Sequence, residues 1–162
     1  MQKIFCVCLV IIFSGCSHFG SLSKKNSSPE WSDDVRMAQA QIESKTDQKI
    51  QGQVNFEQMP NSVIVTFHIE GLMPKGNYQL FLHPDRNCGT QVMTSTPAMT
   101  TMRANTDGIA QNTFKIQDLK VAGPASLAGD IVVLTTSPKG SKVLTPVEVA
   151  CGPVRPQTAG KN

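Results

Sequence analysis

The sequence lacks a large net charge and a hydrophobic run long enough to span a membrane, and it contains few histidines. Its 162 residues carry a formal charge of +3 and three histidines. The apolar run at residues 4–13 has ten residues, whereas a membrane-spanning helix needs roughly 20. A charge this small gives no sign of a surface that attracts nucleic acid or steers a charged ligand. The sequence therefore points away from nucleic-acid binding and offers no charge argument for any partner.

The N-terminus has the pattern of an export signal, because the basic start Met1-Gln2-Lys3 precedes the apolar run and Ser14-Gly15-Cys16 follows it. The Ser-Gly-Cys ending resembles the lipobox of bacterial lipoproteins. That resemblance implies a signal peptide at residues 1–15, acylation of Cys16, and a lipid-anchored protein of the cell envelope that faces the periplasm or the exterior. Phe13 stands where leucine is usual, and an ordinary secretory signal cut near Gly15 is the alternative. Both interpretations predict export.

The five cysteines fall into two groups. Cys6 and Cys8 leave with the signal and Cys16 takes the lipid, so Cys88 and Cys151 remain as an even pair. In an oxidising compartment this pair is predicted to form a disulfide. Closing the loop between Cys88 and Cys151 stabilises a fold by about 4 kcal/mol in the chain-entropy model.

The exported chain divides into a tether, one domain and a tail. Residues 17–29 are polar and rich in Ser, Gly and Lys, so residues 16–36 are expected to form an acylated N-terminus and a flexible tether. Residues 30–36 are compatible with one helical turn after Ser28 and Pro29 or with a lead into a strand. The domain is predicted at 37–153, with a disordered tail at 154–162.

From Met37 onward the hydrophobic period is two, which predicts an antiparallel sheet folded on itself. Val63, Val65, Phe67 and Ile69 share one face of such a strand. About eight strands fit one β-barrel or sandwich with a single core. Their predicted ranges are 37–44, 50–58, 63–69, 78–83, 101–104, 109–116, 129–135 and 144–151.

The order of several motifs in this region resembles that of copper/zinc superoxide dismutase. The motifs are, in order, IQGQVNFEQ at 50–58, IEGL at 69–72, LFLH at 80–83, Cys88, DGIA at 107–110, the Gly-x-x-Val-Val strand that opens at Gly129, and ACG at 150–152. The resemblance covers roughly residues 37–153. It implies an eight-stranded Greek-key barrel and, in agreement with the cysteine count, a bond between Cys88 and Cys151.

The metal chemistry of that family needs six histidines and an aspartate, and this chain has three histidines in all. Of the His-x-His pair, the first position is Phe81 and only the second is kept, as His83. A further histidine position falls on Leu134 or Thr135. The guiding arginine falls on Glu148, which would repel superoxide.

The loop that carries the zinc ligands in that family is also reduced here. Residues 89–104 contain no His, Asp, Glu or Cys. The resemblance therefore implies no catalytic residues and no complete metal site, and His83 is the only retained ligand position.

The expected function is that of an envelope lipoprotein with a catalytically degenerate superoxide dismutase-like domain in a binding or structural role. Two alternatives use a residual copper site at His83: superoxide dismutation, or copper carriage with Met93, Met99 and Met102, whose thioethers suit Cu(I). A lone histidine near scattered methionines is more often packing or surface. His68 is predicted on the solvated face of its strand, and His18 lies in the tether.

Overall fold

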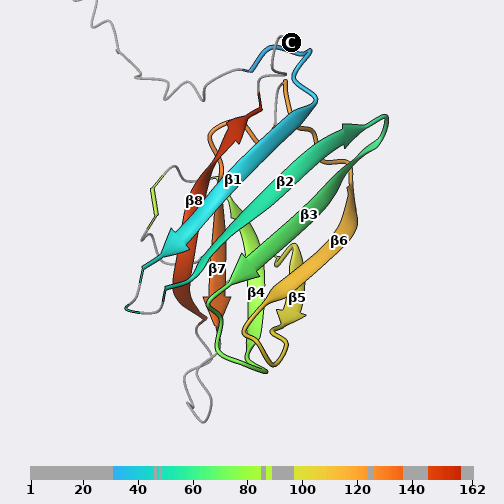
Figure 1. Cartoon of the computed structure of the whole chain (residues 1–162). Helices are drawn as coiled ribbons and strands as arrows, with labels where there is room; N and C mark the ends of the chain where they lie inside the picture. Colours follow the sequence, from blue (N-terminus) through green and yellow to red (C-terminus); the bar gives the residue numbers. More distant parts are fainter. Residues whose placement is uncertain are drawn as a thin grey trace, which may run out of the picture.

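The computed structural model describes residues 31–45, 47, 49–84, 87–88, 97–123, 126–136 and 146–157. These residues form eight β-strands and no helix (Figure 1). Within this part of the chain no helix is long and apolar enough to cross a membrane. The predicted signal peptide, Cys16, His18 and Met93 lie outside the described residues. The strands are β1 (Met37–Ser44), β2 (Gln51–Met59), β3 (Ser62–Glu70), β4 (Asn77–His83), β5 (Thr100–Arg103), β6 (Ala110–Gln117), β7 (Ile131–Thr136) and β8 (Val147–Pro156).

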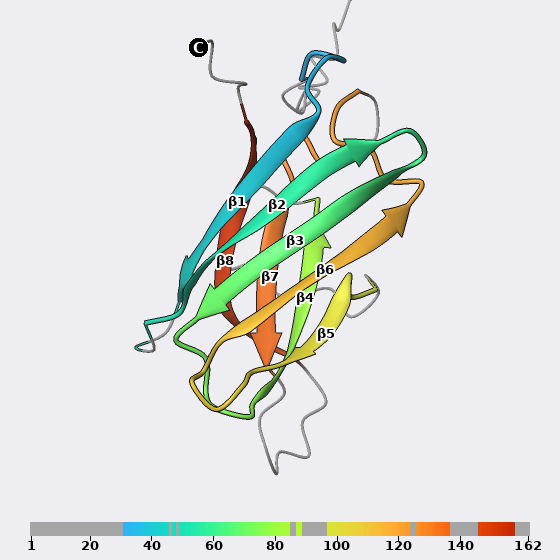
Figure 2. The ribbon, with the colours of Figure 1, turned by 45° about the vertical axis from the view of Figure 1, so that its right-hand side comes forward.

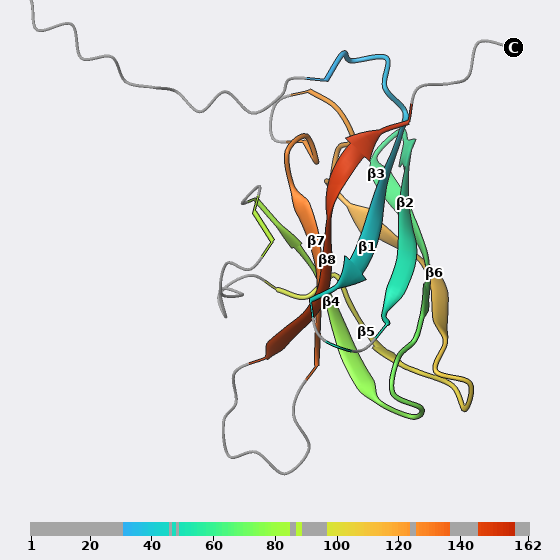
Figure 3. The same ribbon diagram turned by 60° about the vertical axis from the view of Figure 1, so that its left-hand side comes forward.

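The strands form one antiparallel sheet that curls into a nearly closed barrel, in the order β5-β4-β7-β8-β1-β2-β3-β6. The neighbours β8 and β1, β4 and β7, and β3 and β6 are not consecutive in the chain, so the chain crosses between two layers. Figures 2 and 3 show β1, β2, β3 and β6 in one layer, with β4 and β7 in the other. The order ends at β5 and β6, where the barrel does not close.

Strand β3 illustrates why these segments are strands. Its residues Val63, Val65, Phe67 and Ile69 are at most 2 % exposed, and the residues between them face outward. A period of two places alternate side chains on opposite faces of a sheet. The predicted apolar face is confirmed, and His68 lies on the opposite, exposed face as expected.

The main core fills the space between the two layers. Each large side chain that is fully buried there contributes about 1.5–3 kcal/mol relative to an exposed one. Among the largest are Ile42, Phe56, Phe67, Leu80 and Leu134.

The structure extends the domain at its N-terminal side. Trp31 is 9 % exposed and belongs to the main core, and Val35 packs against that core. The Val35 N–H donates to the Ser32 carbonyl across a turn, at 3.0 Å. Residues 31–36 are therefore a packed lead into β1 and not a part of a free tether, because burial of the indole ring holds them against the barrel.

The domain also continues past residue 153, and Val154 is buried in the main core. β8 pairs with β1 as far as Pro156 opposite Ala38, and the Gln157 N–H donates to the Met37 carbonyl. The predicted tail at 154–162 thus begins too early. Val154, Arg155 and Pro156 belong to the sheet because β1 pairs with each of them.

Two glycines hold the barrel in shape. Gly108 has a φ of 76° and ends a turn that begins at Asn105. In this turn the Asn105 side chain accepts hydrogen bonds from the N–H groups of Asp107 and Ile109. A β-carbon at Gly152 would collide with the Gln41 carbonyl oxygen. Only glycine permits β8 to approach β1 this closely.

Candidate functional site

His83 ends strand β4 on the outer face of the barrel. Alternation along β4 directs Tyr78 and Leu80 into the main core, and it places Phe81 and His83 on the other side. His83 is nevertheless only 2 % exposed, because this outer face carries a second, smaller core. The second core consists of Phe81, Ile131, Val133 and Cys151, with Cys88 and Ala98 packed against it.

A disulfide joins Cys88 to Cys151, as the cysteine count predicts. Cys88 follows β4 in the chain, whereas Cys151 lies in β8 opposite Val133 of β7. The bond therefore fastens the segment after β4 to the middle of β8, beside β7. This fastening holds Cys88 against the second core.

The two candidate positions for a further histidine have different surroundings. Leu134 points into the main core, while Thr135 lies on the outer face and is fully buried. Thr135 stands opposite Glu148 at a register shift between β7 and β8. Its hydroxyl has no hydrogen-bond partner in the described part of the chain. Of the two candidates for the further histidine position, Thr135 is therefore the one on the outer face, the face on which His83 lies.

These positions do not converge on His83. The β4–β7 ladder pairs His83 with Ile131 and Gln79 with Thr135, so His83 and Thr135 are four residues apart along the ladder. That spacing corresponds to about 13 Å. Within the described residues no three His, Cys, Asp or Glu side chains gather as metal ligands would. An aromatic ring at Phe81 and a hydroxyl at Thr135 do not fit a copper ion held by imidazoles.

The two described methionines of the copper-carrier alternative lie elsewhere. Met99 and Met102 pack against the main core, whereas His83 shares the outer face with the second core. Met102 pairs with Tyr78, and the Met99 N–H donates to the Leu80 carbonyl. The structure thus assigns these two thioethers to packing on the opposite side of β4.

His68 lies on the exposed face of β3 and makes two hydrogen bonds. Its Nε2 is 2.8 Å from Glu70 Oε1, and its Nδ1 is 3.2 Å from Gln111 Oε1. The hydrogen bond to Glu70, followed by that to Gln111, raises the pKa of His68 above its ordinary value. The hydrogen bond to His68 lowers the pKa of Glu70. This cluster is open to solvent, and no nucleophilic side chain is hydrogen-bonded to it in the described residues.

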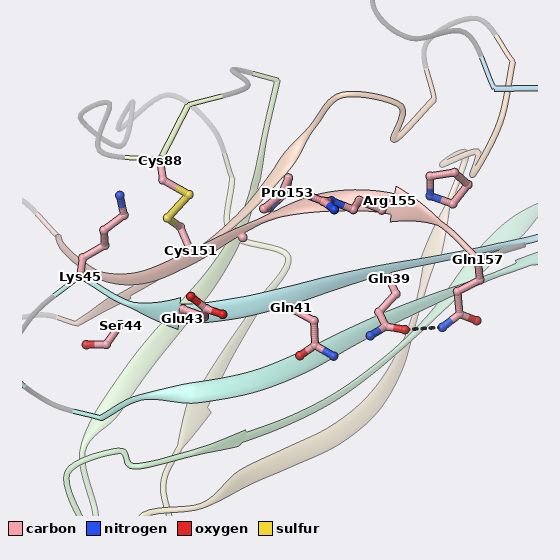
Figure 4. A pocket seen from close by; sticks show the side chains of 12 residues that line it. Gln39, Gln41, Glu43, Ser44, Lys45, Cys88, Cys151, Pro153, Arg155 and Gln157 are labelled. Carbon is pink, nitrogen blue, oxygen red and sulfur yellow. Dashed lines mark hydrogen bonds between the residues drawn. A yellow bond between two sulfur atoms is a disulfide. The ribbon is translucent and has the colours of Figure 1, made fainter.

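A groove of about 740 Å³ lies on the outer face of β1 and β8 (Figure 4). Such a volume is in the range of small-ligand sites. Figure 4 shows the disulfide and Lys45 at one end and the hydrogen-bonded pair Gln39 and Gln157 at the other. Its lining consists of Gln39, Gln41, Glu43, Ser44, Lys45, Cys88, Cys151, Gly152, Pro153, Arg155, Pro156 and Gln157.

The sequence interpretation missed this groove, because its residues carry no catalytic or metal-binding motif. One signal was present: Gln39, Gln41 and Glu43 alternate with the buried residues of β1. That alternation identifies an outward polar row. It does not reveal that β8 lies beside the row and supplies Arg155.

The barrel thus has two adjoining outer regions, an apolar one around His83 and a polar groove on β1 and β8, and the Cys88–Cys151 disulfide borders both. Comparison with known proteins adds no assignment to either: no protein-family model matches the chain, and no curated protein matches it significantly.

Proposed function

We propose that the chain is a lipoprotein of the bacterial cell envelope whose β-domain has the fold of copper/zinc superoxide dismutase and acts by binding instead of by catalysis. The fold type is supported by the strand order, in which β3 pairs with β6, β4 with β7 and β8 with β1. Such crossovers between two layers are typical of Greek-key barrels. The motif order and the bond between Cys88 and Cys151 agree with it.

The observation that carries the non-catalytic assignment is the environment of His83. The one retained ligand position is buried beside Phe81 and Ile131. Of the further family positions, one ligand position holds the phenyl ring of Phe81, one falls on Leu134 or Thr135, and the position of the guiding arginine holds the carboxylate of Glu148. Redox chemistry at copper needs several converging imidazole or sulfur ligands and access for the substrate. Neither condition is supported by the described residues around His83.

The experiment is to purify the full chain, expose it to copper and zinc, and measure bound metal by mass spectrometry and superoxide dismutation on the same sample. We expect neither stoichiometric metal nor activity. Stoichiometric copper with activity that His83→Ala abolishes would overturn the proposal in favour of a dismutase. Copper bound without activity would favour a copper carrier.

The envelope location rests on Cys16 and has its own test. Cells that express the chain with Cys16→Ala should leave the protein in the soluble fraction, and the wild-type chain should partition with membranes and incorporate labelled fatty acid. A single acyl chain holds a protein only weakly, so a lipoprotein anchor needs more than one. Equal partitioning of both chains would contradict acylation at Cys16.

A further inference from the structure

The groove on β1 and β8 has the repeat of an extended peptide. Gln39, Gln41 and Glu43 point outward from β1 at every second residue. Side chains at this spacing repeat about every 6.8 Å. An extended peptide lying along β1 has the same two-residue repeat, so one of its N–H or C=O groups would meet each side chain of the row in turn.

Opposite charges stand near the two ends of the row. Gln39 pairs with Arg155 and Glu43 pairs with Cys151, so Arg155 and Glu43 are four residues apart along the β1–β8 ladder. This separation is about 13 Å, which is also the length of about four extended residues. Neither Arg155 nor Glu43 has an ion-pair partner within the described part of the chain. The ion pair found there joins His68 to Glu70.

The amides between these charges retain hydrogen-bonding capacity. Gln157 Nε2 donates to Gln39 Oε1 at 2.6 Å, and Gln41 Nε2 donates to Gln53 Oε1 at 3.3 Å. No hydrogen bond within the described residues uses the Gln39 Nε2 as donor or the Gln41 Oε1 as acceptor. The row therefore offers a donor at Gln39 and an acceptor at Gln41, which a peptide main chain can match with its own C=O and N–H.

The composition of the groove argues against other ligands. None of its lining residues has an aromatic ring or a branched aliphatic side chain. It therefore provides no platform for stacking a sugar ring and no apolar centre of the kind found in homodimer interfaces. Its remaining cation, Lys45, lies at the Glu43 end, so the groove is not a uniformly basic site either.

We propose that this groove binds a short extended peptide of about four residues with a free amino group and a free carboxylate. The carboxylate pairs with Arg155, the amino group pairs with Glu43, and the main chain between them meets Gln39 and Gln41. This inference rests on the proposed function as a binding protein, and it supplies the ligand class. Charge-assisted hydrogen bonds at both ends provide most of the affinity.

The test uses the full chain in detergent and a randomised tetrapeptide library with free termini. Retained peptides are identified by mass spectrometry, and the most enriched peptide is titrated by calorimetry together with its N-acetylated and C-amidated forms. Arg155→Gln and Glu43→Gln remove the two charges of the groove. Arg36→Gln and Glu57→Gln are matched controls, because both residues are exposed and lie outside the groove.

We expect one or more peptides to be enriched. Arg155→Gln should weaken binding about tenfold or more, and so should amidation of the peptide. Glu43→Gln and acetylation should act likewise at the other end. Each end of the peptide makes one charge pair. Amidation of the peptide should therefore lower its affinity for the Arg155→Gln variant little further. Both control variants should bind as the wild type does.

Three results would overturn the inference: no peptide enriched, affinity unchanged by both groove variants, or retention of a chitin tetrasaccharide where no peptide is retained. The metal and dismutase measurements on the wild-type chain decide the proposed function separately. Absence of peptide binding in a metal-free, inactive protein would remove only the ligand class. Stoichiometric copper with activity would remove the proposed function.

Discussion

The outer face of the barrel differs between its two layers. Over β4 and β7 it is apolar and covered, and Phe81, Ile131 and Val133 form a second core there. Over β1, β2 and β3 it is open and polar, with neutral cross-strand contacts such as that between Thr66 and Thr113. An antiparallel sheet commonly buries one face and leaves the other in water. This barrel does both on its outside, so the buried His83 and the accessible polar surface lie in different places.

Loss of the disulfide should have the largest effect on the unfolding free energy, because the disulfide borders the covered region. A Cys88→Ser/Cys151→Ser double variant should lose about 4 kcal/mol of unfolding free energy, because the bond closes a long loop in the unfolded chain. Urea denaturation measures the loss. Reductant should destabilise the wild-type chain equally and leave the double variant unchanged. An equal response of both chains to reductant would contradict the bond.

The second core should matter more than the open face. Phe81→Ala should lower the unfolding free energy by about 3 kcal/mol, since it leaves a cavity under the segment that the disulfide fastens. The control Gln53→Ala, on the outer face of β2, should change it by less than about 0.5 kcal/mol. The two variants are compared by urea denaturation under the same conditions. Equal effects would mean that the cover over β4 and β7 is not a core.

These two regions were predicted to different degrees from the sequence. The strands and the inward parity of β3 follow from a period of two, which is a local property of residues such as Val63 and Phe67. The pairing of Cys88 with Cys151 follows from the cysteine count and agrees with the resemblance. The second core could not be predicted, because it depends on which outer residues of β4, β7 and β8 become neighbours after the chain crosses between layers.

The structure extends the domain beyond its predicted limits for a related reason. Val154 is distant in sequence from its β1 partner Ala40, and Trp31 is buried in the main core although it lies before the first strand. The polar groove likewise needs β8 beside β1, a pairing between the last strand and the first. Long-range pairing of this kind leaves no local pattern in either segment.

The hydroxyl of Thr135 allows the covered and open regions to be compared at a single atom. Its Oγ1 is buried without a hydrogen-bond partner in the described residues, so Thr135→Val should stabilise the protein by about 1 kcal/mol. Thr66→Val is the matched change on the open face. It removes the contact with Thr113, at 3.1 Å, and should be neutral or slightly destabilising. A loss of stability for Thr135→Val in thermal denaturation would indicate that the hydroxyl has a polar partner.

The smallest effect concerns the titration of the open face. NMR titration should give His68 a pKa above 6.5, mainly because of the hydrogen bond to Glu70. The raised pKa of His68 contributes stability that is present below 6.5 and lost as pH rises through the folded value. The lowered pKa of Glu70 contributes stability that is present above 4.5 and lost as pH falls through its folded value.

The contribution of this pair is therefore confined to mildly acidic pH, between the two folded values. Glu70→Gln should return the pKa of His68 toward 6.5, and Glu57→Gln, on the neighbouring strand, should leave it raised. A His68 pKa that does not respond to Glu70→Gln would show that the hydrogen bond does not hold in solution.

The accessibility of the two strand histidines distinguishes a covered outer face over β4 and β7 from an open one. Acylation of imidazoles by diethyl pyrocarbonate, followed by mass spectrometry of the folded, oxidised chain, compares His83 with His68. His83 is 2 % exposed and should be protected, whereas the exposed His68 should react rapidly. Equal reactivity would mean that His83 is open to solvent, and it would contradict a covered outer face over β4 and β7, on which the proposed non-catalytic role rests.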